Sequence, residues 1–218
     1  MSKLSGVLIG LVATSLWLGL AVWGWGGFAL FFASSARTAL VAVTFALMLA
    51  SVFTSGNLSP GEKEDRGNRW VLWAFLAIGI LDGWLPAYSE RTGFWTFGGD
   101  GVRWLGVFLF AAGGVLRLWP VFVLGRRFSG LVAIQKGHTL VTDGIYARIR
   151  NPSYLGLMIS VFGWGFAFRS VAGLVLAALF LPPLMARIRS EEAMLAAHFG
   201  AQYEAYRARS WRLIPSIY

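Results

Sequence analysis

The hydrophobic positions of this 218-residue chain fall into long continuous runs, without the alternation expected of a half-buried strand. Each run is near the roughly 20 apolar residues that cross about 30 Å of hydrocarbon as a helix. Polar residues gather in short segments between the runs. This pattern predicts an all-α fold, a polytopic integral membrane helical bundle of about six transmembrane helices, at 6–32, 38–56, 69–87, 102–124, 153–168 and 170–187.

Three details of the runs refine this prediction. Only residues 168–170 separate the last two helices, which predicts a tight helical hairpin. Pro182 and Pro183 remove backbone donors and predict a kink in the last helix. The first run follows Lys3 and ends near Phe-Ala-Ser-Ser-Ala at 32–36, which imitates a secretory signal. Because the run is long for a signal, we interpret it as a membrane anchor.

Composition and charge support the same class of protein. Hydrophobic residues make up 57% of the chain and charged residues only 13%, outside the usual range of soluble domains. Most Lys and Arg fall on alternate loops, which predicts that both termini and the segment 126–150 face the cytoplasm, in what we take to be a bacterial inner membrane. The net charge of +9 is then explained by topology and anionic lipid headgroups, so membrane lipids are expected as partners and nucleic acid is not. The opposite side carries few cations: Arg37, Arg91, Arg103 and Arg169.

Residue types also exclude several kinds of chemistry. The chain has no cysteine, which excludes disulfides, thiolate catalysis and cysteine-bound metals. With two histidines and no His-Glu-x-x-His, no metal site is predicted. Two ionisable residues fall inside predicted spans, Asp82 and Arg117; each either has a functional role or reaches the membrane interface.

Polar residues are sparse before Arg126 and dense after it, which divides the chain into N-terminal transmembrane helices (1–125) and a C-terminal core (126–218). The loop at 57–69 is interpreted as an ordinary charged connection. In the C-terminal part, Arg187 and Glu191 are four residues apart and would share one face of a helix. Taken alone, this segment is equally an amphipathic tail with an ordinary ion pair.

Two blocks of this part together carry a family resemblance. They are HTLVTDGIYARIRNPSYLG (138–156) and RIRSEEAMLAAHFGAQYEAYRARSWRLIP (187–215). Their motifs, in this order, closely resemble the isoprenylcysteine carboxyl methyltransferase-like family, which includes phospholipid N-methyltransferases. Asn151 stands where the carboxyl methyltransferases have histidine, and Asn-Pro-x-Tyr-x-Gly is more similar to the phospholipid enzymes. The resemblance covers about residues 130–216 and leaves the methyl acceptor open.

The resemblance implies S-adenosyl-L-methionine as the methyl donor, in a C-terminal helical-hairpin cofactor site. Arg150 offers a cation for the donor carboxylate, and Glu191 or Glu192 offers acceptors for its hydroxyls or ammonium. Tyr146 and Tyr154 offer aromatic faces for the sulfonium, and Gly144 and Gly156 allow close approach of a ligand. The implied catalytic residues are Arg187 and Glu191. The implied cofactor-binding residues are His138, Leu140, Val141, Gly144, Tyr146, Arg150, Asn151, Pro152, Tyr154, Gly156, Glu191 and Glu192.

The expected function is methyl transfer to a lipophilic acceptor, namely a lipid amine, an isoprenylcysteine-like carboxylate or a small hydrophobic thiol. Two other functions remain open. One is an NADPH-dependent, sterol-reductase-like membrane enzyme, because such reductases have a C-terminal ending similar to RLIPSIY. The other is a non-catalytic membrane protein. The sequence gives no expectation for the oligomeric state.

Overall fold

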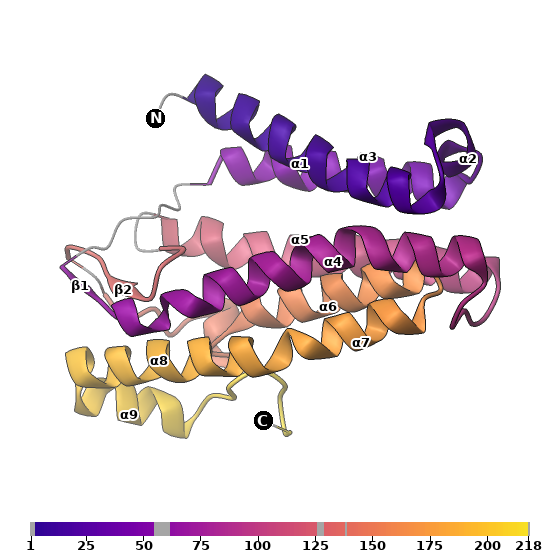
Figure 1. Cartoon of the computed structure of the whole chain (residues 1–218). Helices are drawn as coiled ribbons and strands as arrows, with labels where there is room; N and C mark the ends of the chain where they lie inside the picture. Colours follow the sequence, from indigo (N-terminus) through magenta and orange to yellow (C-terminus); the bar gives the residue numbers. More distant parts are fainter. Residues whose placement is uncertain (1–2, 55–61, 126–128, 138, 218) are drawn as a thin grey trace.

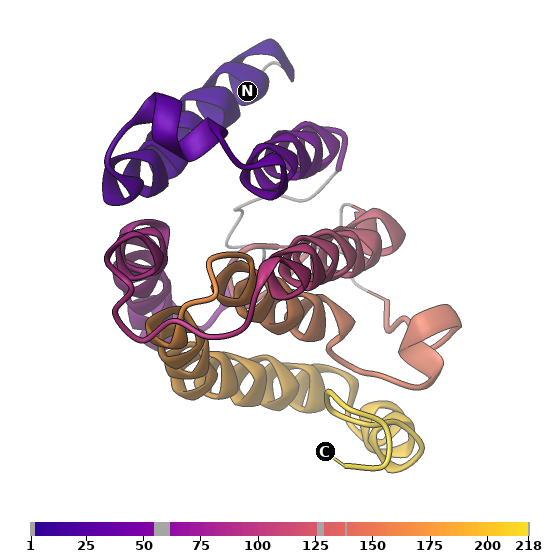
Figure 2. The ribbon, with the colours of Figure 1, turned by 90° about the vertical axis from the view of Figure 1, so that its right-hand side faces the viewer.

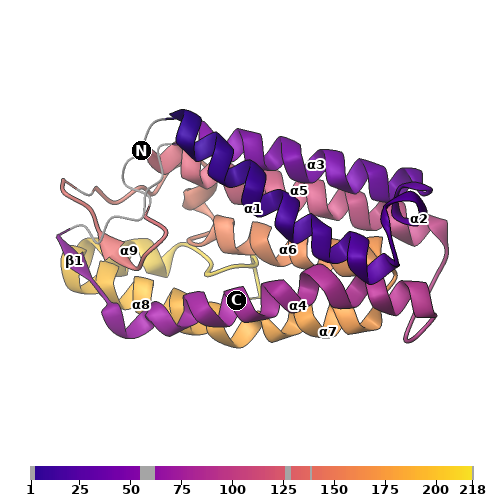
Figure 3. The ribbon, with the colours of Figure 1, turned by 45° about the horizontal axis from the view of Figure 1, so that its top comes forward.

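The computed structural model describes residues 3–54, 62–125, 129–137 and 139–217, and this part of the chain is mainly helical (Figure 1). The long helices run side by side along one direction in all three views (Figures 1–3). The helices in chain order are α1 (Lys3–Trp25), α2 (Phe28–Phe32), α3 (Ser35–Val52), α4 (Trp70–Thr92), α5 (Asp100–Leu124), α6 (Pro152–Ala167), α7 (Val171–Leu179), α8 (Leu181–Phe199) and α9 (Ala201–Ala208).

The number of membrane-spanning helices differs from the prediction. Five helical segments are long and apolar enough to cross a membrane, against about six predicted. The predicted span at 153–168 forms α6, whose 16 residues extend only about 24 Å at 1.5 Å per residue. The chain is an integral membrane protein, and its candidate spans are Leu4–Trp25, Ser35–Val52, Arg66–Thr92, Asp100–Leu124 and Val171–Phe199.

Local sequence explains where the first and last predicted helices break. The run predicted at 6–32 divides into α1 and α2 because Gly26 and Gly27 have φ of 96° and 132°, values that residues with a side chain rarely adopt. The predicted hairpin is present, with α6 and α7 joined through residues 168–170. The last predicted span divides at Phe180, and Pro182 and Pro183 lie in the first turn of α8, where a missing backbone donor costs little.

Glycines allow α5 and α6 to pack with their backbones in contact. A Cβ added at Gly113 would lie 2.5 Å from the Ser160 backbone nitrogen, and one at Gly163 would lie 2.4 Å from that of Phe110. Side-chain-free contacts of this kind are a common way for membrane helices to associate, because they maximise van der Waals packing. The packed pair α5–α6 therefore supports the segment that begins after Leu124 and ends before Pro152.

The core beside this pair contains a buried acid. Trp164 of α6 is 1% exposed and donates its indole N–H to the backbone oxygen of Asp82, at 2.8 Å. The Asp82 side chain is itself buried, and its Oδ1 has no hydrogen-bond partner among the described residues. Asp82 thus lies inside the helix bundle rather than at an interface. Arg117, the other ionisable residue predicted within a span, is exposed on α5.

The two ends of the bundle differ in their charged residues. The N-terminus, the short strands and α9 lie at one end, and α2 and the α4–α5 and α6–α7 connections lie at the other (Figure 1). At the second end, buried Glu90 pairs with Arg103 at 2.6 Å and with Arg37 and Arg169 at 3.8 and 3.9 Å. Arg37, Arg103 and Arg169, which were predicted to lie on one side of the membrane, thus lie at one end of the bundle. Which end faces the cytoplasm remains a prediction.

At the first end, the loop interpreted as an ordinary connection packs against a segment that lines a cavity. Strand β1 (Lys63–Glu64) pairs antiparallel with β2 (Ala133–Ile134), with Lys63 opposite Ile134. Asp65 also accepts a hydrogen bond from Ser190 of α8. The connection between α3 and α4 therefore holds the polar segment 129–137 against α8.

Candidate active site

A cavity at this end of the bundle brings the two sequence blocks together. Its walls come from β2, the segment 140–146, the start of α6, the middle of α8 and α9. Apolar side chains line much of it, and a few polar groups converge among them, as is usual for small-molecule sites. Of the residues implied by the family resemblance, those that line the cavity are Leu140, Val141, Tyr146, Arg150, Asn151, Pro152, Tyr154 and Glu191.

The first polar group of the wall joins α6 to α8. Glu191 Oε1 accepts hydrogen bonds from the Tyr154 hydroxyl and from Arg187 Nε, the latter at 3.2 Å. Arg187 Nε also lies within hydrogen-bond distance of the Tyr154 hydroxyl, and its Nη2 donates to the backbone oxygen of Gly130 at 2.7 Å. The predicted pairing of Arg187 and Glu191 on one helix face is thus present.

These three residues differ in their access to the cavity. Tyr154 and Glu191 line it, and 25% of the Glu191 side chain is exposed. Arg187 is buried behind them and is absent from the cavity lining. Arg187 therefore orients the tyrosine and the carboxylate, whereas Glu191 presents its carboxylate to the cavity.

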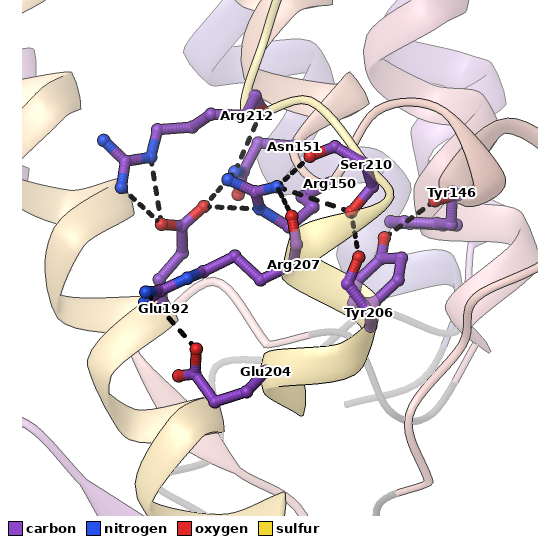
Figure 4. Close-up of polar contacts among 9 residues, drawn as sticks. All are labelled: Tyr146, Arg150, Asn151, Glu192, Glu204, Tyr206, Arg207, Ser210 and Arg212. Atoms are coloured by element: carbon purple, nitrogen blue, oxygen red, sulfur yellow. Dashed lines mark hydrogen bonds and ion pairs between the residues drawn. The ribbon is translucent and has the colours of Figure 1, made fainter. Parts of the chain in front are cut away.

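The second polar group surrounds Glu192 and is drawn in Figure 4. Glu192 Oε1 accepts from Arg150 Nε at 3.0 Å and from Asn151 Nδ2 at 3.2 Å, and Oε2 accepts from Arg212 Nε at 2.9 Å and Nη2 at 2.8 Å. A carboxylate offers about four acceptor positions, and here four nitrogen donors occupy them. Glu192 is therefore a buried counter-ion of the protein itself.

Arg150 is held by this group, by α9 and by residues 209–217, which we call the C-terminal tail. Its Nη1 donates to the backbone oxygens of Arg207, at 3.1 Å, and of Ser210 (Figure 4). The backbone of the same segment pairs with the tail, since Arg150 N donates to Trp211 O and Trp211 N donates to Arg148 O, both at 2.8 Å. The tail thus fixes the position of a cation that lines the cavity.

Three other residues implied by the resemblance lie elsewhere. Gly156 faces α5, where an added Cβ would lie 2.4 Å from the Arg117 backbone nitrogen, so its role in this structure is helix packing rather than approach to a ligand. Gly144 begins a 3-10 turn with φ of 56° and is not part of the cavity lining. His138 lies outside the described residues.

Some cavity residues were not predicted. Tyr203 and Tyr206 of α9 line the cavity and are buried. Burial raises the pKa of both phenols, that of Tyr206 to about 12, so both are neutral near pH 7. Their three-residue spacing on an amphipathic helix was the available signal, since it places both rings on one face. Arg212, which pairs with Glu192 and is not among the residues that line the cavity, was also not predicted as a site residue.

Comparison with known proteins shows what these features are similar to. Residues 102–202 match the family model described as phospholipid methyltransferase. The protein-S-isoprenylcysteine O-methyltransferase of Schizosaccharomyces pombe is 40% identical over 108 residues, covering 48% of this chain and 46% of that protein. The corresponding protein of Dictyostelium discoideum is 32% identical over 130 residues, covering 53% and 50%.

The matched regions are partial. The chain spans about half the length of the curated relatives named above. A solved structure, that of the eukaryotic intramembrane Ras methyltransferase (isoprenylcysteine carboxyl methyltransferase), aligns over all of this chain and 88% of its own, with a TM-score of 0.48 and 20% identity. The family match covers α5, the cavity segments, the α6–α7 hairpin and α8. The chain is thus similar to the phospholipid methyltransferase family over residues 102–202, and to protein-S-isoprenylcysteine O-methyltransferases over about half of its length.

Proposed function

We propose that this protein transfers a methyl group from S-adenosyl-L-methionine to a lipophilic acceptor. The observation that carries the proposal is the cavity, in which residues of two distant sequence blocks meet at one end of a membrane bundle. The residues that line the cavity lie within the region matched to the phospholipid methyltransferase family, except Tyr203 and Tyr206 of α9, which follow the end of that match.

The residues present fit the chemical groups of this donor. Arg150 supplies a cation, and its Nη2 has no hydrogen-bond partner among the described residues, so it is available to a carboxylate. Glu191 supplies an acid whose hydrogen bonds to other described residues all involve Oε1, so Oε2 can accept from a ribose hydroxyl or an ammonium. Tyr146 and Tyr154 supply aromatic rings in the same wall.

The chain's own contribution to the reaction is alignment and protection from water. When bound, S-adenosyl-L-methionine supplies an electrophilic methyl group on a sulfonium. The enclosing wall, held by the ribbon β1–β2 and by α9, excludes water and holds the two reactants in line. For a protonated amine acceptor, Glu191 is placed to accept the proton, because its carboxylate faces the cavity while Arg187 and Tyr154 hold it in position.

Donor binding by calorimetry in detergent tests the proposal. Arg150→Ala and Glu191→Gln are each expected to weaken binding roughly ten- to a hundred-fold, because each removes a charged hydrogen-bond partner. Arg209→Ala and Glu204→Gln are the matched controls, since both side chains are exposed on or beside α9 and neither lines the cavity. Failure of the wild-type protein to bind the donor would end the proposal, and wild-type affinity in both site variants would remove their assignment.

We further propose that the acceptor is a lipid amine or another lipophilic nucleophile rather than principally an isoprenylated cysteine carboxylate. The support is Asn151, which replaces the histidine of the carboxyl methyltransferases. Specificity constants for a farnesylated cysteine analogue, phosphatidylethanolamine and an alkyl thiol, measured in one detergent, test this choice. Much faster turnover of the farnesylated cysteine would restore the carboxyl methyltransferase assignment, which is the activity named for the relatives.

The end that carries the cavity is proposed to face the cytoplasm, which supplies the soluble donor. The support is the excess of Lys and Arg in the loops at this end. Because the chain lacks cysteine, single cysteines report cleanly on topology. An impermeant thiol reagent applied to intact cells should label Thr92→Cys at the opposite end and spare Gln202→Cys on α9. Labelling of Gln202→Cys alone would reverse the orientation.

A further inference from the structure

The hydroxyl of Tyr203 is an unpaired polar group in the wall of the cavity. Tyr203 lies on α9, is 1% exposed and lines the cavity, and its hydroxyl has no hydrogen-bond partner in the part of the chain that the structure describes. Buried polar side-chain atoms nearly always have a partner, because losing water without a replacement is costly. An orphaned hydroxyl at a cavity wall therefore indicates a group that a ligand completes.

Tyr206 lies about one turn further along the same helix, and its hydroxyl, unlike that of Tyr203, has a partner in the protein. Its hydroxyl donates to the backbone oxygen of Tyr146 at 2.8 Å, and this bond joins α9 to the segment before α6. The two tyrosines have similar burial and share one helix face, but only Tyr206 is used to hold the fold together. Helix packing alone therefore does not account for the unpaired hydroxyl.

The charges around Tyr203 indicate what kind of group would complete it. Its phenol interacts electrostatically with Arg150 and Glu192. Glu192 already accepts from four nitrogen donors and has no acceptor position left for a phenol. The two arginines that share Glu192 leave one positive charge in excess, so this part of the wall favours an anion.

The hydroxyl is also in the right protonation state for that purpose. Burial raises the pKa of the Tyr203 phenol, so the group stays neutral and can donate at physiological pH. A neutral donor beside a cation recognises a carboxylate by one hydrogen bond and one charge-assisted contact. In the proposed donor, the carboxylate of the methionine part is the anionic group.

We propose that Tyr203 is a donor-binding residue whose hydroxyl, together with Arg150, binds the carboxylate of S-adenosyl-L-methionine. This inference rests on the proposed function, and it adds a tyrosine of α9, which lies within the second block but was not predicted to bind the donor. It also gives a role to α9, which follows α8 and folds back beside it (Figure 1).

Calorimetry with two ligands tests the inference. The ligands are S-adenosyl-L-methionine and its decarboxylated analogue, and the variant is Tyr203→Phe, which removes one oxygen atom. We expect the variant to bind the complete donor about ten- to a hundred-fold more weakly than the wild type does. Its affinity for the decarboxylated analogue should equal that of the wild type, because the lost hydrogen bond is absent from that complex.

Thermal unfolding without ligand supplies the control. Tyr203→Phe should unfold at or above the wild-type temperature, because the lost hydroxyl has no partner. Tyr206→Phe, which loses a protein hydrogen bond, should unfold at a lower temperature without changing the ratio of the two affinities.

Each other outcome has a defined meaning. No binding of the complete donor by wild-type protein would refute the proposed function itself. Normal binding by Tyr203→Phe, or equal weakening for both ligands, would refute the role of Tyr203 while leaving the proposed function intact. A variant that does not fold would show that the hydroxyl is needed for the structure and would equally overturn the inference.

Discussion

Replacing Glu192 by glutamine is the sharpest test of how the cavity is held together. The substitution keeps the size of the side chain but removes the one negative charge between Arg150 and Arg212. Breaking a buried ion pair from one side costs about 3–5 kcal/mol, because the remaining charge is left without a counter-ion. The Arg150 side chain is 9% exposed and that of Arg212 is 25% exposed, so water partly compensates the second arginine. We therefore expect a loss of about 2–3 kcal/mol in the free energy of unfolding.

Thermal unfolding in detergent measures this loss. For a chain of this size, about 2–3 kcal/mol corresponds to a decrease of roughly 4–12 °C in the transition temperature. Glu191→Gln is the matched variant, since it removes the neighbouring charge but affects a carboxylate with one engaged oxygen, and it should lose donor binding more than stability. A transition temperature of Glu192→Gln within about 1 °C of the wild type would refute the interpretation of Glu192 as an internal counter-ion.

Three further outcomes are expected from the fold. Gly163→Leu should sharply reduce the yield of folded protein, because an added Cβ would lie 2.4 Å from the Phe110 nitrogen, whereas Gly19→Leu, with open space around it, should fold normally. Between about pH 10 and about pH 12 the free energy of unfolding should fall, because the folded pKa of Tyr206 exceeds that of a free phenol. Tyr206→Phe should reduce this fall, and an equal fall in the variant and the wild type would contradict the prediction. Asp82→Asn should unfold at or above the wild-type temperature, since Oδ1 has no partner, and a clear decrease would reveal an undetected one.

The helices were largely predictable because the requirement to cross hydrocarbon imposes a length and a composition on each run. The start and end of α5 are within two residues of the prediction at 102–124. The errors have local physical causes. Gly26 and Gly27 turn the chain inside an apolar run, and hydropathy cannot detect a backbone angle. The segment at 153–168 has the composition of a span, but its length is set by the turn at Arg169 and by its packing on α5.

The sequence predicted residues of the two blocks whose side chains line the cavity. It did not predict the contacts within the protein that hold these residues in place. Arg150 and Glu191 line the cavity as expected. Glu192 was expected to face the donor equally well, because two adjacent glutamates differ only in helix face. The structure directs one toward the cavity and the other toward Arg212, a residue of the tail. Contacts of the tail and of the ribbon β1–β2 depend on pairing between distant segments, for which one sequence contains no signal.

The structure also gives Asn151 a physical role that bears on its difference from the related carboxyl methyltransferases. Its Nδ2 donates to Glu192 Oε1 at 3.2 Å and to the backbone oxygen of Arg212 at 3.1 Å, so one uncharged amide supplies both hydrogens. A neutral imidazole has only one N–H, whereas a protonated imidazole has two but adds a charge beside two arginines. Asn151 therefore satisfies this network independently of pH.

The variant Asn151→His is expected to make stability depend on pH near neutrality. Protonated histidine can donate to both acceptors, and the neutral form leaves one of them unpaired, so the folded state binds the proton more tightly than the unfolded state does. The stabilisation should be present below the ordinary histidine pKa of about 6.5 and should be lost as the pH rises through the higher folded value. Transition temperatures between about pH 5.5 and pH 8.5 should then fall for the variant and stay level for the wild type. A level profile for Asn151→His would show that the two hydrogen bonds of Asn151 do not control this network, and the difference from histidine would have to be explained by the acceptor itself.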